Sequence, residues 1–303
     1  MKFFQFLKNG ITRRQLALSL GFLWLLDGLL QLQPQMFTSN FANQVLSMSA
    51  QGQPPLVAGP IQQVVKMVLA NPAGYDLAFA LMQIILAMLI FVPKTRRLGL
   101  AVSVAWALAV WYLGEGLGGL LGGQTSLLVG APGAALLYAV LAIAAFPRSR
   151  AKKHAGDRPA AWLNLAWATI WLLGAVYQLL PGQNSPFNIA STITAAASGS
   201  PWWLGTINSH IAVAVSDSGL WLIVLLAAIQ AAVGLGAFMP NYIRRLAIYT
   251  GIGLSLVFWY VGQNLGGFYT GLATDPSTGP LLVLMGLAVL GCGYLFAWPN
   301  DLG

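Results

Sequence analysis

The sequence predicts an all-α integral membrane protein with eight transmembrane helices, arranged as two parallel-related four-helix repeats. Composition is the first reason, because 57% of the 303 residues are hydrophobic and 7% are charged, against roughly 25% charged residues in soluble domains. The second reason is that the chain matches itself at a shift of 147 to 148 positions. A soluble fold is not expected, since only seven acidic residues would have to keep so apolar a chain in solution.

Short motifs recur at this shift. Trp24-Leu25-Leu26 recurs as Trp171-Leu172-Leu173, and Trp111-Tyr112 recurs as Trp259-Tyr260. Internal repeats reveal architecture because each copy is expected to fold as one unit. We therefore divide the chain into a first membrane repeat, residues 1–150, and a second membrane repeat, residues 151–303.

Eight apolar runs are long enough to cross a hydrocarbon core, which takes about 20 residues of helix. The first run follows basic residues, as a secretory signal does. Its partner in the second repeat lies in mid-chain, however, and this predicts a helix that is retained in the mature protein. Because each repeat has an even number of spans, both repeats enter the membrane from the same side. The predicted spans are 14–33, 75–93, 97–115, 131–147, 160–180, 219–238, 244–262 and 280–297.

Lysine and arginine gather on one side of these spans, and loops enriched in them are cytoplasmic. Only Lys66 falls on the other side. Both termini are therefore predicted to be cytoplasmic, with the protein in the cytoplasmic (inner) membrane of a bacterium. Topology and attraction to the lipid bilayer account for the net charge of +8, so nucleic acid is not an expected partner. The basic residues on the cytoplasmic side are Lys2, Lys8, Arg13, Arg14, Lys94, Arg96, Arg97, Arg148, Arg150, Lys152, Lys153, Arg158, Arg244 and Arg245.

Two long outer segments, 34–74 and 181–218, are rich in polar residues, glycine and proline. Each contains a short half-apolar stretch, Ile61 to Ala70 and Ile207 to Val215. We expect these stretches to form interfacial or re-entrant helices over the bundle. Long ordered loops often carry function, so a functional site is expected to face outward.

Asp27 is the residue that costs most to place in a membrane. It lies seven residues before Pro34, about 10 Å inside the outer end of the first span. A carboxylate at the centre of a span costs about 2.5–3.5 kcal/mol on insertion scales, which makes such a residue a functional candidate. Its equivalent in the second repeat is Gly174. The alternative is a hydrogen-bonded Asp that fixes helix packing.

Glu115 ends the third span, and its equivalent is Gln263, which cannot carry charge or transfer a proton. We hypothesise that Asp27 and Glu115 converge, with Gln31 and Gln263, on one outward-facing polar cavity in the first repeat. Such a cavity could bind a cation, relay a proton or steer a substrate. The alternative is that Glu115 reaches interfacial water or caps backbone amides.

The segment after the third span is a candidate ligand loop formed by Trp111, Tyr112, Gly114, Gly118 and Gly119. Glycine lets the backbone approach a flat ring closely, and the Trp-Tyr pair could wall a planar ligand such as a quinone. Helix packing is the alternative role for the glycines. Interfacial anchoring is the alternative role for the aromatic pair.

Metal and haem chemistry find little support in the sequence. Cys292 is the single cysteine, and the two histidines, His154 and His210, are predicted on opposite faces of the membrane. A b-type haem with two histidine ligands is therefore not expected, and no ligand spacing indicates a metal site.

The first helix carries a family resemblance. Arg14 is followed by Leu20-Gly21 and Leu26-Asp27-Gly28, ahead of Gln31 and Pro34, and this order resembles the first helix of the DoxX/DoxD group of bacterial four-helix membrane proteins. The chain resembles two such proteins fused in tandem, and it also resembles bacterial membrane proteins of uncharacterised function. Some DoxX/DoxD members are membrane subunits of thiosulfate:quinone oxidoreductase. The resemblance therefore implies a quinone and a periplasmic or membrane redox partner.

Three functions follow as expectations. The first is a redox-associated, quinone-linked membrane subunit with an outward-facing site in the first repeat. The second is a transporter or channel for a small solute or ion, and the third is a structural or assembly subunit of a membrane complex. Whether the chain is itself an enzyme stays open at this point.

Overall fold

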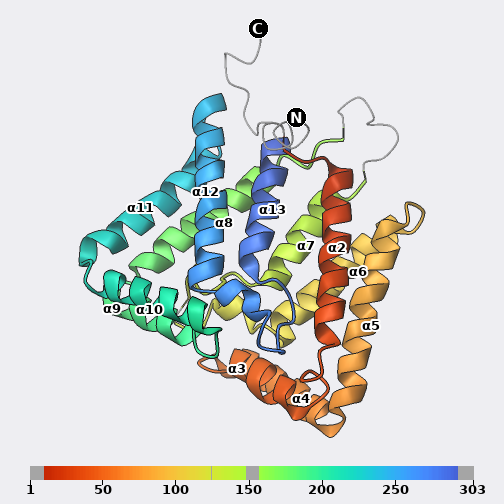
Figure 1. Ribbon diagram of the computed structural model, residues 1–303. Helices are drawn as coiled ribbons and strands as arrows, with labels where there is room; N and C mark the ends of the chain where they lie inside the picture. The colour runs from red at the N-terminus through yellow and green to blue at the C-terminus, as the bar shows by residue number, and fades with distance from the viewer. Residues whose placement is uncertain (1–9, 124, 148–156, 293–303) are drawn as a thin grey trace.

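A computed structural model describes residues 10–123, 125–147 and 157–292 (Figure 1). Within these ranges the chain forms helices α2 to α13 with short 3₁₀ and π segments, and no strand. The predicted all-α fold class is therefore confirmed. The predicted repeat boundary at 150/151, the basic residues and histidine around it, and both chain ends lie outside the described residues.

Every predicted apolar run coincides with a helix in the described part of the chain. Local signals fix several of the boundaries. Thr12 and Gln15 form a capping box at the start of α2, which satisfies two backbone amides that the helix leaves free. Pro72 is the first residue of α5, where its missing N–H costs nothing. The helices are α2 (Arg13–Gln31), α5 (Pro72–Phe91), α6 (Arg96–Leu113), α7 (Ala134–Ala145), α8 (Leu163–Leu179), α11 (Leu220–Gly236), α12 (Asn241–Val261) and α13 (Thr278–Gly291).

Fewer of these helices than expected have both the length and the apolarity of a membrane span. Among the described residues, α5 and α6 meet both conditions, and α11 joined to the preceding helix α10 (Trp202–Ser216) would make a third span bent by 106°. α7 has 12 residues and the described part of α13 has 14. α2 and α12 are long enough, with 19 and 21 residues, but the charged and amide side chains within them lower their mean hydropathy. The fold thus contains two or three candidate spans, and the number eight stays a prediction.

Helices pair in a similar way in the two halves of the chain. α2 packs against α5 and α6 against α7, while α8 packs against α11 and α12 against α13. α13 also contacts α2, α7 and α8, so one hydrophobic core extends through both halves. Trp24 is buried in this core, 4.4 Å from the Tyr138 ring, and its Nε1 donates a hydrogen bond of 2.8 Å to Ser103 Oγ. This bond satisfies the one polar atom that burial of an indole leaves.

The long segments expected on the outer side do contain short helices. In Figure 1 these helices lie across one end of the bundle, opposite the end at which α2 begins and α13 stops. We call this the outer end, after the orientation that the basic residues predict. The elements there are the π segment η1 (Phe41–Leu46), α3 (Ser47–Ser49), α4 (Pro55–Ala70), α9 (Pro186–Ala196), α10, and the 3₁₀ turns η2 (Leu117–Gly119) and η4 (Asn264–Gly267).

Cysteine labelling tests the predicted topology, because the chain has one cysteine, Cys292, and it is buried. In a Cys292→Ala background, a membrane-impermeant maleimide should label Gln51→Cys and Ser198→Cys in intact cells, since both positions are exposed at the outer end. Lys94→Cys and Asp157→Cys should react only after permeabilisation. Labelling of the last two variants in intact cells would contradict the predicted orientation.

Candidate functional site

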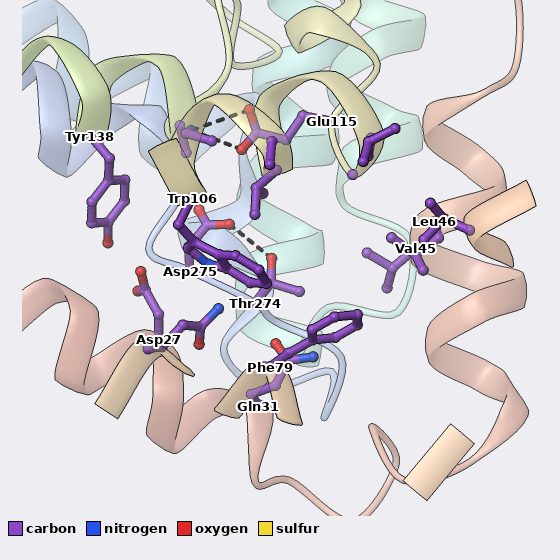
Figure 2. A pocket seen from close by; sticks show the side chains of 18 of the residues that line it. Asp27, Gln31, Val45, Leu46, Phe79, Trp106, Glu115, Tyr138, Thr274 and Asp275 are labelled. Atoms are coloured by element: carbon purple, nitrogen blue, oxygen red, sulfur yellow. Dashed lines mark hydrogen bonds between the residues drawn. The ribbon is translucent and has the colours of Figure 1, made fainter. Parts of the chain in front are cut away.

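A cavity of about 240 Å³ lies at the outer end of the first half of the chain, between α2, α4, α6, α7 and the segment that precedes α13 (Figure 2). Five aromatic rings form much of its wall, and aliphatic side chains from η1, α4 and α6 complete the apolar part. Polar side chains stand at one side of this apolar space. The apolar residues include Trp24, Phe41, Val45, Leu46, Val64, Met67, Phe79, Trp106, Val110 and Leu113.

Asp27 reaches this cavity from α2. Trp24, Asp27 and Gln31 are three and four residues apart, and this spacing places all three on one face of the helix. That face is buried, and Asp27 itself is 1% exposed. In Figure 2 its carboxyl group faces the Tyr138 hydroxyl. The two groups interact with each other, although the geometry is too loose for a well-formed hydrogen bond.

Glu115 lies two residues beyond the end of α6 and joins that helix to the start of α7. Its two carboxyl oxygens accept from the Ala135 amide at 3.0 and 3.2 Å, one of the amides that a helix N-terminus leaves without an internal partner. A Cβ at Gly133, where φ is +100°, would stand 2.4 Å from Glu115 Oε2, so only glycine fits there. Glu115 thus caps backbone amides, as the alternative interpretation held, and it lines the cavity as well.

Burial raises the pKa of Glu115 from 4.5 to about 8. Loss of hydration is the largest cause, and the negative charge of Asp275 adds to it. The amides of Ala135 and Ala134 act in the opposite direction, because they donate hydrogen bonds to the charged form. Near neutral pH this carboxyl group can therefore both take up and release a proton.

Asp275 is a carboxylate of the same cavity that the sequence comparison missed. It comes from the second half, from the loop before α13, and accepts hydrogen bonds from Thr274 Oγ1 at 2.8 Å and from the Ser277 amide at 2.7 Å. Burial raises its pKa, and these two bonds oppose the shift. The expectation that the first half alone supplies the carboxylates is thus incomplete, because the cavity draws on both halves.

A change of register explains why Asp275 was missed. Trp111 Nε1 donates to the Pro132 carbonyl at 2.7 Å, and the matching Trp259 Nε1 donates to the Pro276 carbonyl at 2.8 Å. A constant shift of 148 pairs Pro132 with Pro280 instead. The loop before α13 is therefore shorter by four residues, and Asp275 takes the place that Ala131 has in the first half.

Asp76 and Tyr138 were also missed. Asp76 lies in the first turns of α5, is fully buried, and accepts a hydrogen bond of 2.5 Å from Gln31 Nε2. The position of Asp76 at the start of a predicted span is the sequence feature that could have identified it. Tyr138 lies in the middle of α7, where a hydroxyl group needs a partner. Three of the seven acidic residues thus line the cavity and a fourth, Asp76, binds the lining residue Gln31, while no Lys or Arg is among the described residues that line it.

Four buried polar atoms on cavity-lining side chains lack a well-formed hydrogen bond among the described residues, although Tyr138 and Asp27 interact loosely with each other. Two are donors, Tyr138 Oη and Trp106 Nε1, and two are acceptors, Asp27 Oδ1 and Gln83 Oε1. A buried polar atom without a partner costs roughly 1–3 kcal/mol. A ligand that offered both acceptors and donors would recover part of this cost.

The remaining predicted residues do not all meet at the cavity. Gln263 lies outside it, accepts from the Gly279 amide at 2.9 Å and donates to the Leu127 carbonyl at 3.1 Å. Trp111 and Tyr112 direct their polar atoms to the backbone of Pro132 and Leu56, so neither walls the cavity. Gly114 lines it.

A second hollow, of about 880 Å³, adjoins the cavity on the outer side and holds Gly118 and Gly119 in its wall. Gly118 has a φ of +63°, and a Cβ there would lie 1.9 Å from the Pro132 carbonyl oxygen. Close packing therefore accounts for Gly118, as one interpretation of the sequence held. The candidate ligand loop is split between the cavity, this hollow and its own backbone contacts.

No protein family, curated protein or solved structure that is known matches the chain. Among the described residues, no three His, Cys, Asp or Glu side chains are placed to hold a metal ion together. The function must therefore be argued from the cavity itself.

The raised pKa of Glu115 predicts a pH-dependent effect on stability. Below about pH 4.5 the carboxyl group makes its full contribution to the free energy of unfolding, and this contribution is lost as the pH rises through about 8. We expect Glu115→Gln to change the apparent Tm little near pH 5 and to raise it by a few degrees near pH 9, since the amide keeps the bond to Ala135 without a buried charge. A thiol-reactive dye that reports exposure of Cys292 can follow unfolding in detergent. An equal effect of the substitution at both pH values would contradict the assigned pKa.

Proposed function

We propose that the chain is a multi-pass membrane protein whose cavity binds the head group of a quinone or quinol, in a quinone-linked redox subunit. One observation carries this proposal: the walls of an aromatic, apolar cavity hold two donors and two acceptors that lack a well-formed hydrogen bond. Quinone carbonyls accept hydrogen bonds from groups such as Tyr138 Oη and Trp106 Nε1. Quinol hydroxyls also donate, which matches Asp27 Oδ1 and Gln83 Oε1.

Size and surroundings support the same ligand. A cavity of about 240 Å³ lies just below the roughly 300–1,000 Å³ of sites for drug-sized ligands, which suits a single substituted ring. Met67 of α4 and Ala109 of α6 line the cavity and are also exposed. The cavity therefore reaches the surface between these helices, beside one of the two clearest candidate spans. An apolar tail could extend there into lipid while the ring occupied the cavity.

The proposal includes the architecture of eight spans in two parallel repeats, with the outer end facing away from the cytoplasm of a bacterium. The matched bonds of Trp111 and Trp259, and the matched pairing of helices, support the duplication. Apart from Lys66 on α4, the described basic residues, among them Arg96, Arg97 and Arg244, lie near helix ends remote from the cavity, which supports the orientation. A periplasmic or membrane redox partner, as the DoxX/DoxD resemblance implies, would exchange electrons with the bound quinone.

A cation transporter is the second candidate, favoured by the carboxylates of Asp27, Glu115 and Asp275 without a basic residue in the cavity wall. Transport needs a polar path to the opposite face. Towards the inner end of α2, however, Leu20, Ala17 and Leu16 are apolar and fully buried. This packing favours a site that opens at one end of the protein.

Binding of decylubiquinone to the purified protein in detergent, measured by isothermal titration calorimetry, tests the proposed ligand. Trp106→Phe and Tyr138→Phe should each weaken binding about fivefold to tenfold, since each removes one hydrogen bond of about 1 kcal/mol. Trp171→Phe is the matched control, because the Trp171 Nε1 is also buried without a partner but lies outside the cavity.

The same titration decides between the two candidates. If the wild-type protein does not bind decylubiquinone, or if the control variant binds as weakly as the cavity variants, the quinone proposal is wrong. Binding of tetraphenylphosphonium that strengthens with rising pH, and disappears in Asp27→Asn, would favour the cation transporter instead.

A further inference from the structure

The inner cavity and the outer hollow share a short stretch of wall. Both are lined by Val45, Gly114, Glu115, Ala134 and Asp275. Only two of these five residues have polar side chains, and both are carboxylates. We call the pair Glu115 and Asp275 the neck, because they stand where the buried aromatic space meets the outer hollow.

The two sides of the neck differ in chemistry. On the outer side, Ser49, Gln53, Thr125 and Ser277 line the hollow together with glycines, so water can enter it. On the inner side, Tyr138 and Asp27 are 2% and 1% exposed, and their oxygens face each other without a well-formed hydrogen bond. The carboxylates thus separate these buried groups from a polar, open space.

Backbone contacts hold the neck in place. The Ala135 amide binds Glu115 from the start of α7, and the Ser277 amide binds Asp275 from the turn before α13. Each carboxyl group keeps acceptor capacity beyond these bonds, because a carboxylate offers about four lone-pair positions. A proton can therefore bind at the neck without displacing the bonds that position the side chains.

The charged surroundings suit proton exchange near neutral pH. Glu115 has a pKa of about 8, raised first by burial and then by the charge of Asp275. The other titratable groups that face the neck are Asp27 from α2 and Tyr138 from α7. Lys66, the basic residue of α4, is exposed and does not line the cavity.

We infer that Glu115 and Asp275 relay protons between the inner cavity and the outer hollow. A proton leaves an O–H or N–H group in the cavity and binds a carboxylate oxygen of the neck. That carboxylic O–H then breaks, and the proton passes to water in the hollow. The group in the cavity keeps the electron pair of its broken bond until the reverse steps return a proton to it from water. One proton moves and no electron is transferred, so this inference is independent of the ligand that the cavity takes.

The second half of the chain supplies a natural control for the substitution that tests it. Gln263, at the position that matches Glu115, accepts the Gly279 amide at 2.9 Å at the start of α13. A neutral amide therefore fills this role at a helix start. Glu115→Gln should keep the local geometry and remove only the site that takes up and releases protons.

The experiment follows the indole N–H of Trp106 as it exchanges with D₂O, by NMR of protein labelled with ¹⁵N in the tryptophan side chains. Trp106 lines the inner cavity, and its Nε1 is buried without a partner. We expect exchange to slow by at least about tenfold in Glu115→Gln/Asp275→Asn, because positioned carboxyl groups speed proton transfer by about 10²–10⁴. Trp171, buried and unpartnered but away from the cavity, is the internal reference and should not change.

The conservative variant Glu115→Asp should keep much of the wild-type exchange rate of the Trp106 indole N–H, because it keeps a titratable group at the neck. An unchanged Trp106 rate in the double variant would overturn the relay, and so would a wild-type Trp106 rate no faster than that of Trp171. If both indole rates rose in the double variant, that protein would have opened. In that case the relay would be tested in the single variants, Glu115→Gln and Asp275→Asn. If the Trp106 exchange rate in both equalled that of the wild type, the relay would be wrong. None of these outcomes depends on quinone binding, so the relay and the proposed ligand can fail separately.

Discussion

The bond between the Glu115 carboxyl group and the Ala135 amide organises the outer end of the first half. It joins the end of α6 to the start of α7 and satisfies an amide that the helix would otherwise leave free. Because Gly133 has no side chain, the carboxyl group can lie against the backbone there. The same position brings it to the boundary between the inner cavity and the outer hollow. A structural cap and a titratable group at an opening are thus one side chain.

The second half shows what this cap requires and what it does not. Gln263 binds the amide of Gly279 as Glu115 binds that of Ala135, so a charge is unnecessary for joining the two helices. A carboxyl group in the same role carries the cost of desolvation that raises its pKa to about 8. Retaining a costly group where a neutral one would serve is typical of functional positions. This difference supports our proposal that Glu115 has a function beyond the cap, whereas Gln263 serves as the cap of the Gly279 amide.

Periodicity and local stop signals were sufficient to predict the helices, since each of the eight apolar runs coincides with one. The carboxylates of the cavity were harder to predict from the sequence than the helices. Asp27, Gln31 and Glu115 could be found because an acid or amide within an apolar run is costly wherever the helix packs. Asp275 could not, because the loop before α13 is four residues shorter than its counterpart and the comparison of copies lost register there. Trp111 and Tyr112 were expected to wall a ligand, yet their polar atoms bind backbone carbonyls, a choice that depends on tertiary contacts and leaves no trace in sequence.

The packing below the cavity limits what its carboxylates can do. The Trp24 and Tyr138 rings pack against each other in the core, tilted by 43° with their centroids 4.4 Å apart, and Leu20 and Leu16 continue the buried face of α2 towards the inner end. An ion moving that way would lose its hydration without gaining a polar partner, at a cost of many kcal/mol. In the part of the chain that the structure describes, the routes to the carboxylates therefore start from the outer hollow and from between α4 and α6. A quinol bound there would release its protons on the outer side, so any coupling between its oxidation and a proton gradient would have one fixed direction.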